Sequence, residues 1–211
     1  MATRGKASRS DRQGQRMLLF LGLGIVAIAV LIGVLTASGS GGLSVDEVAG
    51  EVEITGTALP PHGGDPMADV AMGQLAPEVR GAGHDGTPAA IGGGAQVISF
   101  MAAWCPSCQA ELPHLVDWYD EGLFDDGVEL VVVSTFLDAT RPNWPPQDWF
   151  EAEGYTGTVL VDDADSSVAR AFGMSASPFW VVIDADGNVL YRTAGQLSRE
   201  SMVDITSLLT Q

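Results

Sequence analysis

The two cysteines of this chain, Cys105 and Cys108, are the residues whose type and spacing most clearly imply chemistry. Two thiols separated by two residues can close a small disulfide ring when oxidised and open it when reduced. A strand-forming run, 97–101, precedes the pair, and a helical pattern follows it. A dithiol at a strand-to-helix junction is the arrangement that makes a cysteine reactive rather than merely buried.

The expected helix gives the two thiols different tasks. A helix that begins at Cys105 directs its free backbone N–H groups and its positive dipole end at the first sulfur. We therefore expect the pKa of Cys105 to lie below the free value of about 8.5. Cys108 lies one turn further along and should be more buried. Cys105 would attack a substrate disulfide, and Cys108 would release the mixed disulfide that forms.

Two other uses of the cysteine pair compete with redox chemistry. A bridge that only staples the fold would close a very short ring, for which loop-closure entropy gives about 2 kcal/mol. A zinc site would need two further ligands, and the three histidines, His62, His84 and His114, show no paired spacing. The sequence favours redox chemistry. It contains no cofactor or metal motif, so the dithiol itself would carry the two electrons.

The charge of the chain is divided sharply along its length. Residues 1–16 hold five basic side chains and one acidic side chain, whereas the rest holds 26 acidic and five basic ones. An acidic surface repels phosphate backbones, so nucleic acid is not expected as a partner.

An apolar segment, 17–35, follows the basic start and carries no charge over 19 residues. A helix of this length spans roughly 28 Å, close to the bilayer hydrocarbon thickness of about 30 Å. We expect an uncleaved transmembrane anchor, with the basic residues 1–16 in the cytoplasm and the acidic part outside it. A cleaved signal peptide is the competing interpretation, although 36–38 makes a mediocre cleavage site. Under either interpretation the globular part lies where disulfides can persist.

The remaining pattern predicts a flexible or irregular extension over 36–75 and an α/β domain over 76–211. The predicted elements are a short strand at 52–55, a hairpin of 76–79 and 88–91, strands at 95–101, 128–134, 158–162, 179–184 and 189–193, and helices at 106–121, from 145, at 166–172 and from 198. Alternating strands and helices favour a mostly parallel central sheet covered on both faces, with antiparallel edge strands from the last hairpin.

Two more segments carry signals outside the cysteine pair. Pro178 precedes the strand at 179–184, and proline suits the first residue of a strand because it donates no ladder hydrogen bond. From the residues alone a trans Ser177–Pro178 bond is expected, since cis bonds are uncommon. The segment 140–146 follows a strand, and loops at the carboxyl ends of strands border the site in doubly wound sheets. We expect this loop to shape a substrate groove.

A resemblance to the thioredoxin superfamily rests on three features: the run Trp-Cys-Pro-Ser-Cys at 104–108 after a strand, Pro113 eight residues beyond the first cysteine, and Pro178 ahead of a core strand. The segments 108–113 and 179–187, with the turn region 86–88, are similar to the TlpA/ResA/DsbE-like branch. Members of that branch are membrane-tethered or secreted thiol–disulfide oxidoreductases. The resemblance covers roughly residues 76–211.

The resemblance implies a thioredoxin-like α/β fold, a central mixed β-sheet flanked by helices, here preceded by an N-terminal transmembrane helix. It implies that Pro178 is cis and packs beside the cysteines, where the neighbouring backbone pairs with a substrate strand. Trp104, Pro106 and Ser177 are then candidate substrate-binding residues. Glu111 matches an acidic residue near the active site, where a carboxylate would raise the cysteine pKa values. A solvated helix residue is the alternative for Glu111.

The chain also departs from the superfamily at two positions. Ser99 stands where cytoplasmic thioredoxins place a buried Asp, and Ser177 stands where Thr is common before the proline. A buried proton-relay carboxylate is therefore missing at position 99. These departures weaken the case for fast, general disulfide reduction and leave a narrower extracytoplasmic role open.

The sequence thus predicts a membrane-anchored, extracytoplasmic thiol–disulfide oxidoreductase, with Cys105, Cys108 and Glu111 as catalytic residues. Its expected partners are cysteine-containing exported proteins and a membrane electron-donor protein, and one candidate reaction is the reduction of apocytochrome c thiols in cytochrome c maturation. A disulfide-forming oxidase and a non-catalytic binding domain with an inert bridge are the alternatives. A reduction potential of about −270 mV would indicate a reductant, and one of about −120 mV would indicate an oxidant.

Overall fold

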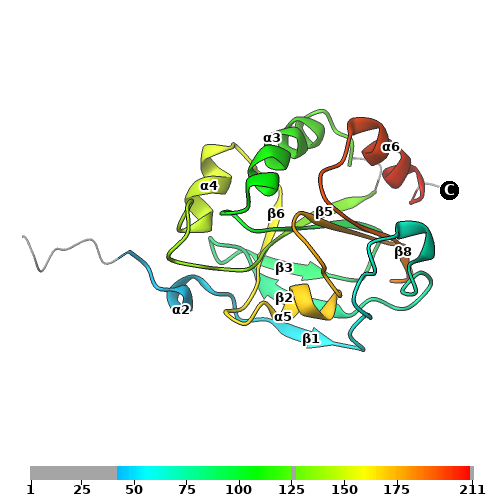
Figure 1. The fold of residues 1–211 in the computed structure, drawn as a ribbon, viewed down its shortest axis with the longest axis horizontal. Coiled ribbons are helices and arrows are strands. Elements are labelled where there is room, and N and C mark those ends of the chain that lie inside the picture. The colour runs from blue at the N-terminus through cyan, green and yellow to red at the C-terminus, as the bar shows by residue number, and fades with distance from the viewer. Residues whose placement is uncertain (1–41, 125–126, 210–211) are drawn as a thin grey trace, which may run out of the picture. The chain divides into compact units, whose positions relative to one another are not determined.

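A five-stranded mixed sheet forms the centre of the protein, and its strands are the β-branched and aromatic runs of the sequence (Figure 1). The computed structural model of the protein describes residues 42–124 and 127–209. The strands lie in the order β6-β5-β4-β7-β8. They comprise β4 (Gln96–Met101), β5 (Glu129–Ser134), β6 (Thr158–Val161), β7 (Phe179–Ile183) and β8 (Val189–Ala194). Every residue of β4 and of β7 is buried, as expected of strands covered on both faces.

Helices cover one face of this sheet, and a second, smaller sheet covers the other (Figure 1). The first face carries α3 (Pro106–Asp120), α4 (Pro146–Ala152) and α6 (Arg199–Ser207). The second face carries α5 (Ser167–Ala171) and the antiparallel strands β1 (Glu53–Thr55), β2 (Glu78–Ala82) and β3 (Pro88–Ile91). Side chains alternate along β4, so Val97 and Met101 pack toward α3 whereas Ile98 and Phe100 pack toward α5.

The predicted order of strands and helices is confirmed, but the sheet is less parallel than expected. Only β4–β5 and β5–β6 run parallel, while β4–β7 and β7–β8 run antiparallel. The interior strand β7 is therefore antiparallel, and β8 alone of the last hairpin lies at an edge. After β6 the chain passes through α5 and enters β7, which lies on the other side of β4 from β5 and runs antiparallel to β4. The alternation of strands and helices in the sequence does not predict this route.

The extension predicted as a flexible linker over 36–75 is largely part of the folded unit. Residues 43–211 form one compact unit, so the boundary expected at residue 76 lies inside it. This stretch contains the short helix α2 (Val45–Val48) and the 3₁₀ turn η1 (Pro66–Ala68), and it buries Leu59 and Ala71 in the core. The expected flexibility was therefore wrong for residues 43–75, whereas the expected irregular backbone and the short strand at 52–55 are present. An ion pair distant in sequence is one of the contacts that fix this stretch to the sheet.

That ion pair joins Asp69 to Arg192 of β8, and both side chains are almost completely buried. The guanidinium is bidentate: Nη2 lies 2.6 Å from Oδ1 of Asp69, and Nε lies 2.7 Å from Oδ2. Its Nη1 donates to the carbonyl oxygens of Pro60 and Phe172, at 3.0 and 2.8 Å. The hydrogen bonds from Arg192 hold the pKa of Asp69 below its ordinary value. One buried arginine thus joins three segments of the chain.

The apolar segment 17–35, expected to cross a membrane, lies outside the described residues. Over residues 42–124 and 127–209, no helix is both long and apolar enough to span a bilayer.

Arg192→Met is expected to lower the free energy of unfolding by about 3–5 kcal/mol, because it leaves the buried carboxylate of Asp69 without a partner. Chemical denaturation followed by circular dichroism measures this change. The matched control is Arg199→Met, which removes a half-exposed ion pair with Glu121 and should cost about 1 kcal/mol or less. A loss for Arg192→Met as small as that of the control would contradict the role given to the buried pair.

Candidate active site

Cys105 lies at the N-cap of α3, a few residues after β4 ends. Its backbone N–H donates to the carbonyl of Ala102 at 2.9 Å, which closes the turn between strand and helix. Pro106 follows at the first helical position, where its missing N–H leaves no bond unmade and its fixed φ suits a helix start. The side chain of Cys105 is partly exposed and that of Cys108 is fully buried, and both thiols are free.

The two thiols differ in pKa in the predicted direction. Burial by itself would raise the pKa of Cys105, but interactions with the amide of Cys108, the side chains of Ser177 and Cys108, and the amide of Ser107 together outweigh it, and the net pKa is lowered. Burial raises the pKa of Cys108 to about 12. At neutral pH the first sulfur is therefore the one prepared to attack, and the second is held as a protonated thiol.

The segment Ser177–Pro178 lies against the nucleophile. The thiol of Cys105 donates to the carbonyl oxygen of Ser177, with 3.6 Å between the two atoms. The Ser177–Pro178 bond is cis, as the resemblance implied, so the trans bond expected from the residues alone was wrong. The carbonyl of Pro178 accepts from the amide of Gly195 at 2.8 Å. Both residues thus contact segments that are distant in the chain, and local sequence patterns cannot show such contacts.

Glu111 is buried on α3, three residues after Cys108, with 1% of its surface exposed. The alternative that it is a solvated helix residue was therefore wrong. One carboxylate oxygen, Oε1, accepts from the amide of Leu197 at 2.9 Å, and the other, Oε2, is buried without a hydrogen-bond partner among the described residues. Burial raises the pKa of this carboxyl, and the bond from Leu197 opposes that shift. Glu111 thus faces the loop between β8 and α6.

The loop predicted to border the dithiol does contact the segment before it. Nε1 of Trp104 donates to the carbonyl of Phe136 at 2.7 Å. Nδ2 of Asn143 donates to the carbonyl of Ala103 at 2.9 Å. Arg141 lies over the ring of Trp104, with 4.4 Å between its guanidinium carbon and the ring centroid. Arg141 lies in the segment 140–146 that was expected to shape a substrate groove, but its contact with the ring of Trp104 was not predicted, because Trp104 lies far away along the chain.

The other predicted residues lie where the helix start puts them. Pro106 is exposed and, together with the partly buried Trp104 and Ser177, leaves one side of Cys105 open to a partner. Ser99 is fully buried, and its hydroxyl has no hydrogen-bond partner among the described residues. Within the described residues, no cluster of three or more His, Cys, Asp or Glu side chains could hold a metal ion.

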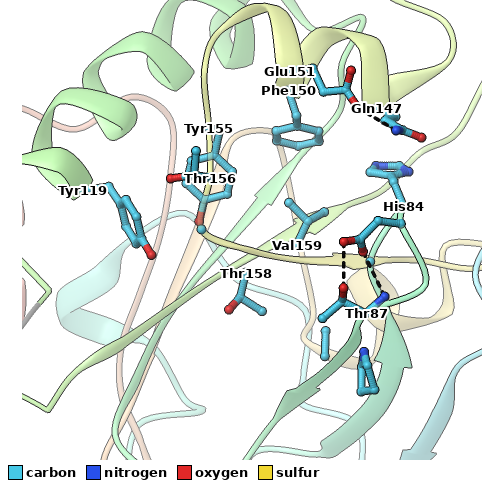
Figure 2. A pocket seen from close by; sticks show the side chains of 15 residues that line it. His84, Thr87, Tyr119, Gln147, Phe150, Glu151, Tyr155, Thr156, Thr158 and Val159 are labelled. Carbon is cyan, nitrogen blue, oxygen red and sulfur yellow. Dashed lines mark hydrogen bonds between the residues drawn. The ribbon is translucent and has the colours of Figure 1, made fainter.

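A separate pocket of about 430 Å³ lies along the edge strand β6 (Figure 2). The turn at His84 and the aromatic side chains of Tyr119, Phe150 and Tyr155 line it. Burial lowers the pKa of His84 to about 4, so this imidazole is neutral at pH 7. The lining contains neither cysteine, nor Ser177, nor Pro178. The dithiol therefore works at a surface and not inside this pocket.

The chain is similar to known proteins over most of its length. Residues 64–209 match the Redoxin family. The "Thiol:disulfide interchange protein DsbE homolog" of Paracoccus denitrificans is 29% identical over 163 residues, which cover 75% of this chain and 86% of the relative. The "Thiol:disulfide interchange protein HelX" of Rhodobacter capsulatus is 32% identical over 144 residues, which cover 64% of this chain and 74% of the relative.

Solved structures support the same grouping. The crystal structure of a thiol:disulfide interchange protein, a thioredoxin family protein from Chlorobium tepidum, aligns with a TM-score of 0.55 at 25% identity. The alignment covers 68% of this chain and 100% of that one. The predicted thioredoxin-like α/β fold is thereby confirmed. With the family match and with two thiols of opposite pKa shift at a helix start, the chain belongs to the Redoxin family and is a thioredoxin-like thiol–disulfide oxidoreductase.

Proposed function

We propose that this protein acts outside the cytoplasm as a reductant of disulfides in exported proteins. The observation that carries the exchange chemistry, whichever way the electrons flow, is the contrast between the two thiols. Cys105 is accessible with a lowered pKa, whereas Cys108 is buried with its pKa raised to about 12. A two-step exchange requires an accessible thiol that attacks first and a second thiol that stays protonated until the mixed disulfide has formed.

The exchange proceeds in two balanced steps. In the first, the thiolate of Cys105 attacks one sulfur of a substrate disulfide, that S–S bond breaks, and the other substrate sulfur leaves as a thiolate that takes up a proton. In the second, Cys108 loses its proton and attacks the sulfur of Cys105, which releases the second substrate thiol. Two electrons pass to the substrate, and the Cys105–Cys108 disulfide forms. A membrane protein that donates electrons through its own dithiol would reduce this disulfide again.

A polypeptide fits this site better than a small molecule does. The nucleophile is partly exposed beside the backbone of Ser177, and the separate pocket of Figure 2 does not include it. The cis Pro178 follows directly, so a substrate segment can lie along this backbone while its sulfur meets Cys105. Two relatives carry the name thiol:disulfide interchange protein. A disulfide between cysteines of apocytochrome c is the candidate substrate within this proposal, and its thiols are the product.

The place of action rests on the N-terminal sequence. The uncharged segment 17–35 and the basic residues before it fit a single membrane anchor with its acidic domain outside the cytoplasm. An oxidising compartment would supply the substrate disulfides.

The proposal is tested by replacing each cysteine in turn. Cys105→Ser should abolish reduction of a peptide disulfide, because the remaining thiol is buried and protonated. Cys108→Ser should react once and accumulate a mixed disulfide between Cys105 and the peptide, because the releasing thiol is gone. Mass spectrometry of acid-quenched reactions measures both outcomes. The matched control is Ser107→Ala, within the same ring, which should react at a rate close to that of the unchanged protein.

Undiminished exchange by Cys105→Ser would contradict the proposal. So would a resistance of the oxidised protein to mild dithiols, since that would identify the bridge as inert.

We further propose that Glu111 tunes the protonation of Cys108, its neighbour one turn away on the buried side of α3. Glu111→Gln keeps an oxygen that can accept from Leu197 but removes the carboxyl group that can exchange a proton. We expect the second step, release of the mixed disulfide, to slow about tenfold or more, while the first step is little changed. Rapid-quench kinetics separate the two steps. Equal rates of release in both proteins would contradict this role. If Glu111→Gln lowered the free energy of unfolding but left the rate of release unchanged, Glu111 would have a structural role alone.

A further inference from the structure

Arg141 places a positive charge directly over Trp104, the residue before the nucleophile. Its guanidinium carbon lies 4.4 Å from the centroid of the Trp104 ring. Arg141 is exposed, and Trp104 and Cys105 are partly exposed, so the charge lies on the surface that a substrate approaches. A guanidinium that stacks on an aromatic face is held in place by that face, yet its planar edge keeps its N–H donors available.

The charge of Arg141 is not neutralised within the described part of the protein. There, Arg80, Arg192 and Arg199 form ion pairs within 4.0 Å, whereas Arg141 does not. The positive charge of Arg141 contributes to lowering the pKa of Asp138, but hydrogen bonds from the side chain and amide of Thr140 account for most of that lowering. Oδ1 of Asp138 accepts from both groups of Thr140, at 2.7 and 2.9 Å. The guanidinium is therefore available to an external anion.

The loop that carries Arg141 is braced against the redox segment on both sides. Before Arg141, the carbonyl of Phe136 accepts from Nε1 of Trp104 at 2.7 Å. After it, Nδ2 of Asn143 donates to the carbonyl of Ala103 at 2.9 Å. Both Phe136 and Asn143 adopt positive φ, at 50° and 60°, which is uncommon for residues with side chains. The position of the charge over Trp104, the residue before Cys105, is thus built into the fold.

Arg141 is not among the groups that set the pKa of the nucleophile. The pKa of Cys105 is set by burial, by the amides of Cys108 and Ser107, and by Ser177 and Cys108 side-chain contacts. The sequence beyond residue 16 holds 26 acidic and only five basic side chains, so acidic partners are repelled by most of this surface. An unpaired arginine beside the nucleophile offers such a partner one favourable orientation.

We infer that Arg141 is a specificity-determining residue that binds a carboxylate of the substrate polypeptide. This inference rests on the proposed function and names the feature of its substrates: an acidic side chain near the reacting cysteine. An extended segment advances roughly 3.3 Å per residue, so an acidic residue about two positions from that cysteine can reach past Trp104 to the guanidinium. The covalent exchange itself is unchanged.

The test compares three oxidised peptides that differ at one residue, two positions from the reacting cysteine: Glu, Gln or Lys. The reduced protein is mixed with each peptide, and the second-order rate constant is measured by rapid quench at low ionic strength. The unchanged protein should react about three- to tenfold faster with the Glu peptide than with the Gln peptide, and high salt should reduce this preference. Arg141→Gln should bring the ratio of the two rate constants to about one.

A charge reversal separates recognition from support of the loop. Arg141→Glu should prefer the Lys peptide over the Glu peptide, which a purely structural role of Arg141 would not produce. The matched control is Arg170→Gln, which removes another exposed arginine without an ion pair in the described residues and should keep the preference for Glu. The pKa of Cys105, from the pH dependence of its alkylation, should be the same in all variants.

Three results would overturn the inference: a Glu preference that survives Arg141→Gln, no Glu preference in the unchanged protein, or no Lys preference in Arg141→Glu. In each of these cases reaction with the Gln peptide still supports the proposed function. If the unchanged protein reacted with none of the three peptides, the proposed function would fail, and the inference with it.

Discussion

The activity of this protein depends on the placement of the Cys105 sulfur at the start of α3, where the free amides of the first helical turn favour a thiolate. The amides of Cys108 and Ser107 have no carbonyl partners in a helix of this kind, so they are free to stabilise a thiolate at the N-cap. The stabilisation works only if the sulfur stays at the helix end. The turn at Ala102 and the bonds that Gln109 and Asn143 donate to the carbonyl of Ala103 fix that position.

The same helix turn separates the two thiols into two environments. One turn of α3 carries the chain from the surface at Cys105 into the core at Cys108, which packs with Leu112 and Leu115 between the helix and the sheet. Burial then raises the pKa of the second thiol, while hydrogen bonds lower that of the first. The order of the two exchange steps follows from this placement. A motif with both sulfurs in solvent would have no such order.

Local patterns in the sequence were enough to predict the elements and their order, because those depend on neighbours in the chain. The strand at 128–134 and the helix from Pro146 are visible as a β-branched run and a helix-start pattern. The features missed were contacts across long separations. Asp69 and Arg192 stand 123 positions apart, and nothing near either residue shows that they form one buried pair.

The candidate site likewise has one part that local sequence patterns predict and another part that depends on contacts between distant residues. The two cysteines, Cys105 and Cys108, could be singled out from their spacing, since their chemistry is contained in one helix turn. The burial of Glu111 depends on the loop at Leu197, and the position of Arg141 depends on the ring of Trp104. The isomers of the cis bonds at Pro145 and Pro178 likewise depend on the tertiary fold. Substrate recognition is therefore the part of the site that sequence patterns revealed least.

The central claim is that the helix start gives the two thiols separate ionisation. It is tested most directly by an NMR titration of the reduced protein labelled with ¹³C at the cysteine Cβ atoms. The account predicts that Cys105 titrates first, at a pH below that of cysteine in an unfolded peptide, and that Cys108 remains a thiol until the pH approaches about 12. Ionisation of Cys108 before Cys105, or of both thiols at the same pH, would contradict it.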